Sequence, residues 1–199
     1  EVLVRALVEA ELPQGAIVAI DGDHAQLREL LQMKELIDLV VPRGGDDLKA
    51  FLMEHSKVPV IYAAAGNNHV YVDATADLDK AARIAVNAKV QRPGVCNAAE
   101  TLLVHRDVAD AFLPRVAELL TGHGVQLRVS DQARAAIGEP AAAYPTATDE
   151  DWATEYLDLT MAVRVVDGID DAIAHIVRYG SGHSEAIITE SLSAAHQFE

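Results

Sequence analysis

The 199-residue sequence has a single cysteine, few aromatic residues, few cations and no long apolar run. One cysteine cannot form an internal disulfide, which fits a reducing, cytoplasmic compartment. No stretch approaches the roughly 18 to 20 consecutive apolar residues that a membrane span requires. The net charge of −15 argues against a nucleic acid or an anionic membrane as partner, because both are polyanions. A small anionic substrate stays compatible, since only its pocket needs to be positive.

Half of the residues are hydrophobic, and short apolar runs alternate with helical patterns along the chain. Apolar residues at helical spacing predict helices over residues 2–12, 25–34, 46–55, 75–89, 108–120, 169–179 and 192–198. Short apolar runs predict strands over residues 16–20, 37–41, 58–61, 69–72, 99–104, 125–129, 161–166 and 185–189. Residues 138–154, with two prolines and little periodicity, predict an irregular connection. Apolar strands separated by helices are typical of a parallel sheet covered on both faces, so the sequence predicts an α/β fold.

The small-residue run that ends at Gly66 predicts a boundary between two parts of the chain. Residues 1–66 form one helix and strand series without a candidate nucleophile, and residues 67–199 form a second series that contains Cys96. A cleft between two α/β units is a common place for a site.

Cys96 is the candidate nucleophile of this sequence. It lies between a helical pattern and an apolar, strand-like run, and Pro93 and Gly94 predict a turn that presents it. Lys89 and Arg92 lie within seven positions, and nearby cations stabilise a thiolate over a thiol. The alternative is that a lone cysteine is a small buried hydrophobe, and that the two cations are solvated surface charges.

Four segments together resemble the γ-glutamyl phosphate reductases, also called glutamate-5-semialdehyde dehydrogenases, within the aldehyde dehydrogenase superfamily. The segments are IDLVVPRGG at residues 37–45, NAKVQRPGVCNAAETLLV at 87–104, EYLDL at 155–159 and YGSGHSEAI at 179–187. The similarity runs nearly end to end, and the cysteine segment is its most specific part. It implies a catalytic cysteine domain at 67–199, cut short at its C-terminal end, and part of a dinucleotide-binding domain at 1–66.

The resemblance implies that Cys96 attacks the acyl phosphate of γ-glutamyl phosphate, expels phosphate and leaves a thioester. NADPH would reduce that thioester to glutamate 5-semialdehyde, a step of proline biosynthesis. Lys89 and Arg92 would counter the charges of phosphate and thiolate, and the backbone at residues 94–96 would supply an oxyanion donor. Asn97 and His183 lie in matching motifs and are predicted to line the substrate pocket. No metal is expected.

The same resemblance assigns cofactor contacts. Arg43, Gly44 and Gly45 fall between a predicted strand and a helix, where glycines let a backbone approach a phosphate and the helix N-terminus favours an anion. Glu155 occupies the position that holds the nicotinamide ribose in the superfamily. The alternatives are an ordinary tight turn and a surface glutamate.

The sequence departs from the superfamily at two places. The glutamate that activates water in hydrolytic aldehyde dehydrogenases is absent from residues 62–66, which read YAAAG. Its absence fits reduction of a thioester rather than hydrolysis to an acid. Many reductases of this kind carry a cysteine where this chain has Asn68, and we expect that difference to spare catalysis.

Segments of the family that would precede Glu1 and follow Glu199 are not in the sequence, so we expect an internal fragment that is inactive alone. The full-length parent could be a homo-oligomer. Two competing functions remain open at this point: a noncatalytic module that binds an anionic metabolite or a partner subunit, and an aldehyde-oxidising enzyme of the same superfamily.

Overall fold

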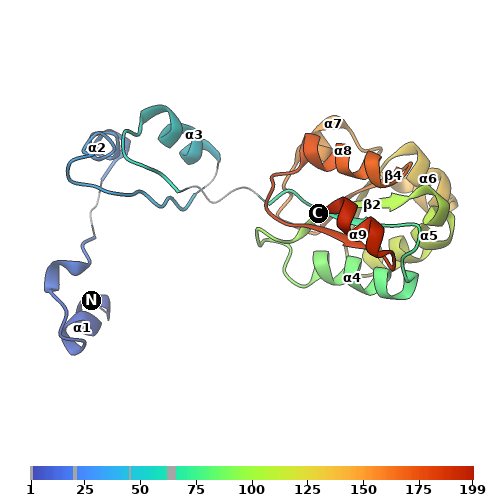
Figure 1. The fold of residues 1–199 in the computed structure, drawn as a ribbon, viewed down its shortest axis with the longest axis horizontal. Helices are drawn as coiled ribbons and strands as arrows, with labels where there is room; N and C mark the ends of the chain where they lie inside the picture. The colour runs from blue at the N-terminus through green and yellow to red at the C-terminus, as the bar shows by residue number, and fades with distance from the viewer. Residues whose placement is uncertain (1, 20–21, 45, 62–65) are drawn as a thin grey trace. The chain divides into compact units, whose positions relative to one another are not determined.

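The computed structural model describes residues 2–19, 22–44, 46–61 and 66–199. The chain divides into two compact units, Glu1–Ala63 and Ala64–Glu199, and each is described by itself. Figure 1 traces the helices of the first unit in blue to teal, and the sheet of the second from teal to red. Assignment of the first unit to a dinucleotide-binding domain stays a prediction.

The first unit contains the helices α1 (Val2–Glu9), α2 (His24–Leu30) and α3 (Asp46–His55), with a short 3-10 helix η1 (Gln14–Ala16). Asp23 begins α2 with a capping box, because its carboxylate accepts from the N–H groups of the first turn and the Gln26 side chain accepts from the Asp23 N–H. Leu31 and Leu52 are buried in this unit. The three predicted helices are therefore present, the first two shorter than predicted.

The three strands predicted in the first unit were wrong for the described residues. Residues 16–19 contain the end of η1 and no strand, and residues 37–41 and 58–61 contribute only an isolated parallel bridge between Val40 and Val60. Ile17 and Val18 are 45% and 70% exposed. An apolar run becomes a strand only when a neighbouring strand pairs with its backbone over several residues, and within the described part of this unit the pairing of these runs stops at that single bridge.

The second unit is built on a five-stranded, fully parallel sheet in the order β3-β4-β2-β1-β5. Its strands are β1 (Asn68–Val72), β2 (Ala99–His105), β3 (Gln126–Val129), β4 (Thr160–Val166) and β5 (Glu185–Ile188). Its helices are α4 (Leu78–Val90), α5 (Arg106–Gly122), α6 (Asp131–Ile137), α7 (Asp149–Ala153), α8 (Ile169–Tyr179) and α9 (Leu192–Phe198). The α/β prediction is confirmed here, as are the strands predicted at these places.

Alternate residues of the central strands face two separate cores. Val70, Val72, Leu102 and Val104 join the cluster under α4, α5 and α6, whereas Tyr71 and Leu103 join the cluster under α8 and α9. Figure 1 shows α4 and α8 on opposite sides of the strands. A strand buried on both faces favours apolar residues at successive positions, which is why these strands read as mostly apolar runs.

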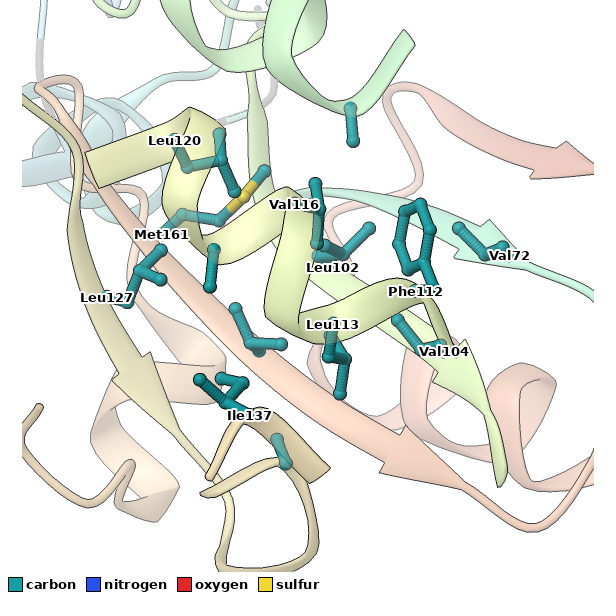
Figure 2. Packing of buried hydrophobic residues seen from close by; sticks show 14 of the residues in the cluster. Val72, Leu102, Val104, Phe112, Leu113, Val116, Leu120, Leu127, Ile137 and Met161 are labelled. Atoms are coloured by element: carbon teal, nitrogen blue, oxygen red, sulfur yellow. The ribbon is translucent and has the colours of Figure 1, made fainter. Parts of the chain in front are cut away.

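Helix α5 supplies the largest share of the first core. Phe112, Leu113, Val116 and Leu120 are all essentially buried, and Figure 2 shows them lying over the strands next to Leu102, Val104 and Met161. Their spacing of one, three and four residues places them on one face of the helix.

Truncation of Leu113 should strongly destabilise the second unit. Leu113→Ala removes a fully buried side chain and leaves a cavity, so we expect a loss of about 2 to 5 kcal/mol in unfolding free energy, measured by urea denaturation. Leu119→Ala, on the same helix but 39% exposed, is the matched control and should cost much less. Equal losses for both variants would contradict the packing described here.

The connection predicted as irregular at residues 138–154 contains two short helical segments, a 3-10 helix η2 (Glu139–Ala143) and α7. Thr148 begins α7 with a capping box to Asp151. Helices of five residues leave too few turns for a periodic pattern, which explains why the sequence did not reveal them. Across the described residues, no helix is long and apolar enough to cross a membrane.

Candidate active site

The candidate site residues of the second unit gather at the amino ends of the parallel strands. Cys96 and Asn97 directly precede β2, Glu155 precedes β4 by a few residues, and His183 directly precedes β5. Because all strands of a parallel sheet run the same way, these loops meet at the end of the sheet where the strands begin, called here the amino edge. Sites of open α/β sheets usually lie at the carboxyl ends of the strands, so a site at the amino edge is unusual.

Cys96 is exposed and lies in a turn between α4 and β2. The turn is closed by a hydrogen bond from the Ala98 N–H to the Val95 carbonyl, 3.0 Å long. An exposed thiol on a tight turn excludes the alternative that Cys96 is a buried hydrophobe. The position suits a nucleophile that must reach a substrate carbonyl.

The cysteine turn is fastened to the sheet by Asn68, the first residue of β1. The Asn68 side-chain amide donates to the carbonyl oxygens of Cys96 (2.8 Å), Ala98 (2.8 Å) and Gly66 (2.6 Å). Asn68 is 3% exposed, so these bonds are shielded from water and worth more than surface bonds. Asn68 therefore positions the backbone that carries the thiol, a role that the sequence did not indicate.

Gly66 joins the cysteine turn to Glu155. A Cβ atom placed on Gly66 would lie 1.7 Å from the Cys96 carbonyl oxygen, so only glycine allows the two backbones to approach this closely. On its other side, the Gly66 N–H donates to Oε1 of Glu155 over 2.7 Å. Cys96, Gly66 and Glu155 thus form one contiguous group, and the half-buried Glu155 is more than surface filler.

Lys89, predicted to counter the charges of phosphate and thiolate, forms an ion pair inside the second unit. Its side chain is fully buried, with Nζ 2.6 Å from Oε2 of Glu100, which is also fully buried. Burial lowers the pKa of Lys89 and raises that of Glu100, and the contact between them opposes both shifts. The ammonium is therefore directed at Glu100, and a direct contact with substrate phosphate stays a prediction.

The remaining predicted substrate residues are exposed. Arg92 and Asn97 flank Cys96 in the same loop, where a guanidinium and an amide can meet an anionic substrate. His183 precedes β5, and its Nδ1 lies 2.9 Å from Oγ of Ser184. Contact of each with substrate stays a prediction.

The predicted phosphate turn lies in the first unit. Arg43 and Gly44 are exposed and shortly precede α3, whereas Gly45 lies outside the described residues. Asp47 lies in the first turn of α3, and its charge suits the positive end of the helix. The role of this turn in cofactor binding stays a prediction.

A network of buried polar side chains around His69 and His175 links β1, β4, β5 and α8. Glu185 Oε2 accepts from the His69 N–H (2.7 Å) and lies 3.0 Å from its Nδ1. The His69 ring packs edge-on against His175 at 5.3 Å. Arg164 donates to Nδ1 of His175 over 2.7 Å, so His175 is neutral and carries its proton on Nε2.

The His175 environment predicts a specific loss of stability in acid. Burial, aided by the charges of His69, Arg164 and Arg178, lowers the pKa of His175 from 6.5 to about 3. Between these values the unfolded chain binds a proton that the folded chain does not, so stability falls as pH falls through this window. The slope from this one group is up to about 1.4 kcal/mol per pH unit.

Urea denaturation at several pH values between 7 and 4.5 checks this expectation. His175→Phe should remove that part of the slope, whatever it does to stability at pH 7. His123→Phe, at an exposed position, is the control and should leave the slope unchanged. An unchanged slope in His175→Phe would contradict a neutral buried His175.

Three buried residues in or beside the cysteine loop were missed by sequence reasoning: Gly66, Asn68 and Glu100. Glu100 did leave a signal, because a carboxylate inside an apolar strand run needs a buried partner, and Lys89 was available eleven residues earlier. Asn68 left a weaker one, as a polar residue at the start of an apolar strand. Gly66 was used only as a boundary, and its close approach to Cys96 has no sequence signature.

A parallel α/β unit that presents an exposed cysteine beside a carboxylate, at the amino edge of its sheet, defines a class of candidate cysteine-dependent enzymes. The sequence matches the model of the Aldehyde dehydrogenase family over residues 1–139. The chain belongs to the aldehyde dehydrogenase family.

Curated relatives narrow the similarity further. The chain is 50% identical over 198 residues to a γ-glutamyl phosphate reductase of Geobacter metallireducens, covering 99% of this chain and 46% of that protein. It is 51% identical over 198 residues to the γ-glutamyl phosphate reductase of Moorella thermoacetica, with the same coverage. The chain therefore spans about half the length of the curated relatives it matches. The resemblance drawn from the four sequence segments is confirmed.

Solved structures agree. The crystal structure of γ-glutamyl phosphate reductase from Thermotoga maritima matches with a TM-score of 0.92 and 44% identity, covering 98% of this chain and 47% of that one. A NADP-dependent glyceraldehyde-3-phosphate dehydrogenase from Bacillus halodurans, complexed with NADP, matches with a TM-score of 0.74 and 20% identity over 98% of this chain and 49% of that one. The second similarity shows the fold alone.

Proposed function

We propose that this chain is the cysteine-bearing part of an NADPH-dependent reductase that converts γ-glutamyl phosphate to glutamate 5-semialdehyde and phosphate, in proline biosynthesis. The observation that carries the proposal is the exposed Cys96, held on its turn by Asn68 and Gly66. The similarity to curated γ-glutamyl phosphate reductases supplies the substrate.

The thiolate of Cys96 adds to the acyl carbon of the substrate, forming a C–S bond and an oxyanion, and collapse of the oxyanion then breaks the C–O bond to phosphate. Phosphate leaves with the bonding electron pair, and a γ-glutamyl thioester remains on Cys96. A backbone N–H of the cysteine turn would stabilise the oxyanion, a contribution worth about 3 kcal/mol in the transition state. Arg92, exposed in the same loop, would attract the anionic substrate.

A nicotinamide cofactor, when bound, supplies the hydride that reduces the thioester carbonyl. Glu155 fits one end of such a cofactor, because Oε1 accepts from Gly66 and Oε2 is left as an acceptor for a ribose hydroxyl. The exposed Arg43 fits a phosphate. After reduction, cleavage of the C–S bond releases the aldehyde and returns the Cys96 thiolate.

The absence of a water-activating carboxylate favours reduction of the thioester over its hydrolysis to an acid. Residues 62–66 contain no carboxylate, so the chain lacks the glutamate that activates water at this place in hydrolytic relatives. A thioester protected from activated water survives long enough to be reduced. An aldehyde-oxidising enzyme is therefore the weaker proposal.

The test is reduction of NADP⁺ by glutamate 5-semialdehyde, with and without phosphate, which runs the reaction in reverse. It compares this chain with a version extended at both ends to the length of the relatives. Phosphate-dependent activity in the extended protein alone is the expected result. Absence of activity in both would favour a noncatalytic module that binds an anionic metabolite or a partner subunit.

Two further attributes belong to the proposal. The partner is a small anionic molecule, consistent with the net charge of −15, which disfavours polyanions. A cytoplasmic location is consistent with one cysteine that has no disulfide partner. Preference for NADP over NAD, and assembly of the parent as a homo-oligomer, remain predictions.

A further inference from the structure

The buried ion pair of Lys89 and Glu100 is placed unusually for a pair that only stabilises a fold. Lys89 lies in the last turn of α4 and Glu100 is the second residue of β2, so the pair closes the base of the loop that carries Cys96. Both side chains are fully buried. Apolar residues of similar volume often replace such a pair without loss of stability, so its presence at this point suggests another role.

The pair also contacts the segment that carries Glu155. Lys89 Nζ lies 5.9 Å from the centre of the Tyr156 ring. Burial raises the pKa of Glu100, and the backbone amides of Leu157 and Tyr156 act against that rise. Oε1 of Glu100 has no hydrogen-bond partner among the described residues.

The segment at residues 155–157 lies close to the cysteine loop, on one side through Gly66 and on the other beside Gly94. Glu155 accepts from the N–H of Gly66, whose backbone touches that of Cys96. The Leu157 carbonyl oxygen would lie 3.4 Å from a Cβ placed on Gly94. Leu157 itself has φ of 58°, a conformation that costs free energy for a branched side chain and persists only when its surroundings impose it.

We propose that Lys89 and Glu100 are positioning residues: the pair holds residues 155–157 against the cysteine loop, and so fixes Glu155 and Cys96 relative to each other. The kinetic consequence rests on the proposed function. The positional consequence does not, because it concerns only the described contacts.

The test compares Lys89→Met, Glu100→Met and the double variant with the wild-type chain. Each single variant leaves one buried charge unpaired and should unfold at lower urea concentration, whereas the double variant should recover most of that loss. Hydrogen exchange then separates positioning from stability. In the double variant, exchange at residues 93–98 and 154–158 should be at least tenfold faster than in the wild type, with β2 and β4 unchanged.

In the extended protein, the double variant should lower kcat for semialdehyde oxidation at least tenfold and change the KM for the semialdehyde less than threefold. Arg115→Met, which removes the surface pair with Asp79, is the matched control and should change neither exchange nor kcat. If the double variant does not fold, Glu100→Gln, which keeps the shape of the side chain, replaces it in the same comparison.

Wild-type exchange at both segments in a stable double variant would overturn the proposal and leave the pair a purely structural one. A wild-type extended protein without phosphate-dependent activity would overturn the proposed function instead, and the exchange result would still decide the role of the pair.

Discussion

Replacement of Cys96 with serine should abolish phosphate-dependent NADP⁺ reduction in the extended protein, with a loss of kcat of at least about a thousandfold. A serine hydroxyl is almost fully protonated near neutral pH and is a much weaker nucleophile than a cysteine thiolate. Cys96 is exposed and its side chain is not part of the core, so the fold should be unaffected.

Two measurements make this result specific to the thiol. Urea denaturation should give the same midpoint for Cys96→Ser and the wild type. Iodoacetamide should label the wild-type chain once, because Cys96 is the only cysteine in the sequence, and should not label the variant. Retained turnover in Cys96→Ser would remove this residue from the mechanism.

Gly66→Ala should have the second largest effect. The new methyl group would lie 1.7 Å from the Cys96 carbonyl oxygen and 2.5 Å from its carbonyl carbon, and backbone atoms cannot yield as a flexible side chain can. We expect a loss of about 3 kcal/mol or more in unfolding free energy. We also expect a fall in kcat of about a hundredfold, because a displaced thiolate no longer reaches the acyl carbon in the geometry that attack requires.

The control for that variant is Gly122→Ala, since a Cβ at Gly122 meets nothing within 4 Å. Gly122 ends α5, and alanine there should be neutral or slightly stabilising. Steady-state kinetics and urea denaturation on both variants separate the clash from the general effect of losing a glycine. Wild-type kcat in Gly66→Ala would contradict the close approach between Gly66 and the cysteine turn.

The fold of the second unit follows from the sequence because each apolar run there has a paired neighbour. Residues 99–104 and 161–166 read as strands, and they pair as β2 and β4. The same kind of run at residues 16–19 forms no strand in the first unit, because pairing is a property of the surroundings and not of the run. Local pattern therefore predicts a strand only where tertiary structure supplies its partner.

The sequence predicted the reactive residue of the candidate site but not the residues that hold it in place. The predicted turn and the neighbouring cations in the sequence indicated Cys96 as the nucleophile. Lys89 was predicted from its proximity in sequence to stabilise the Cys96 thiolate, and the structure adds a contact that proximity did not indicate, the ion pair with the buried Glu100. Asn68 acts through its side-chain amide and Gly66 through the close approach of its backbone, and such contacts depend on strand order, which the sequence does not state.

The central claim is that Cys96 carries the acyl group, and trapping that intermediate tests it most directly. The extended protein is mixed with glutamate 5-semialdehyde and NADP⁺ without phosphate, and the reaction is quenched in acid. Acid protonates the amino group of the bound γ-glutamyl moiety and so slows its attack on the thioester. The protein is then digested for mass spectrometry. The account predicts a γ-glutamyl group on the peptide that contains Cys96, and its loss when phosphate is added before the quench. An unmodified Cys96 peptide, under conditions in which NADP⁺ is reduced, would contradict it.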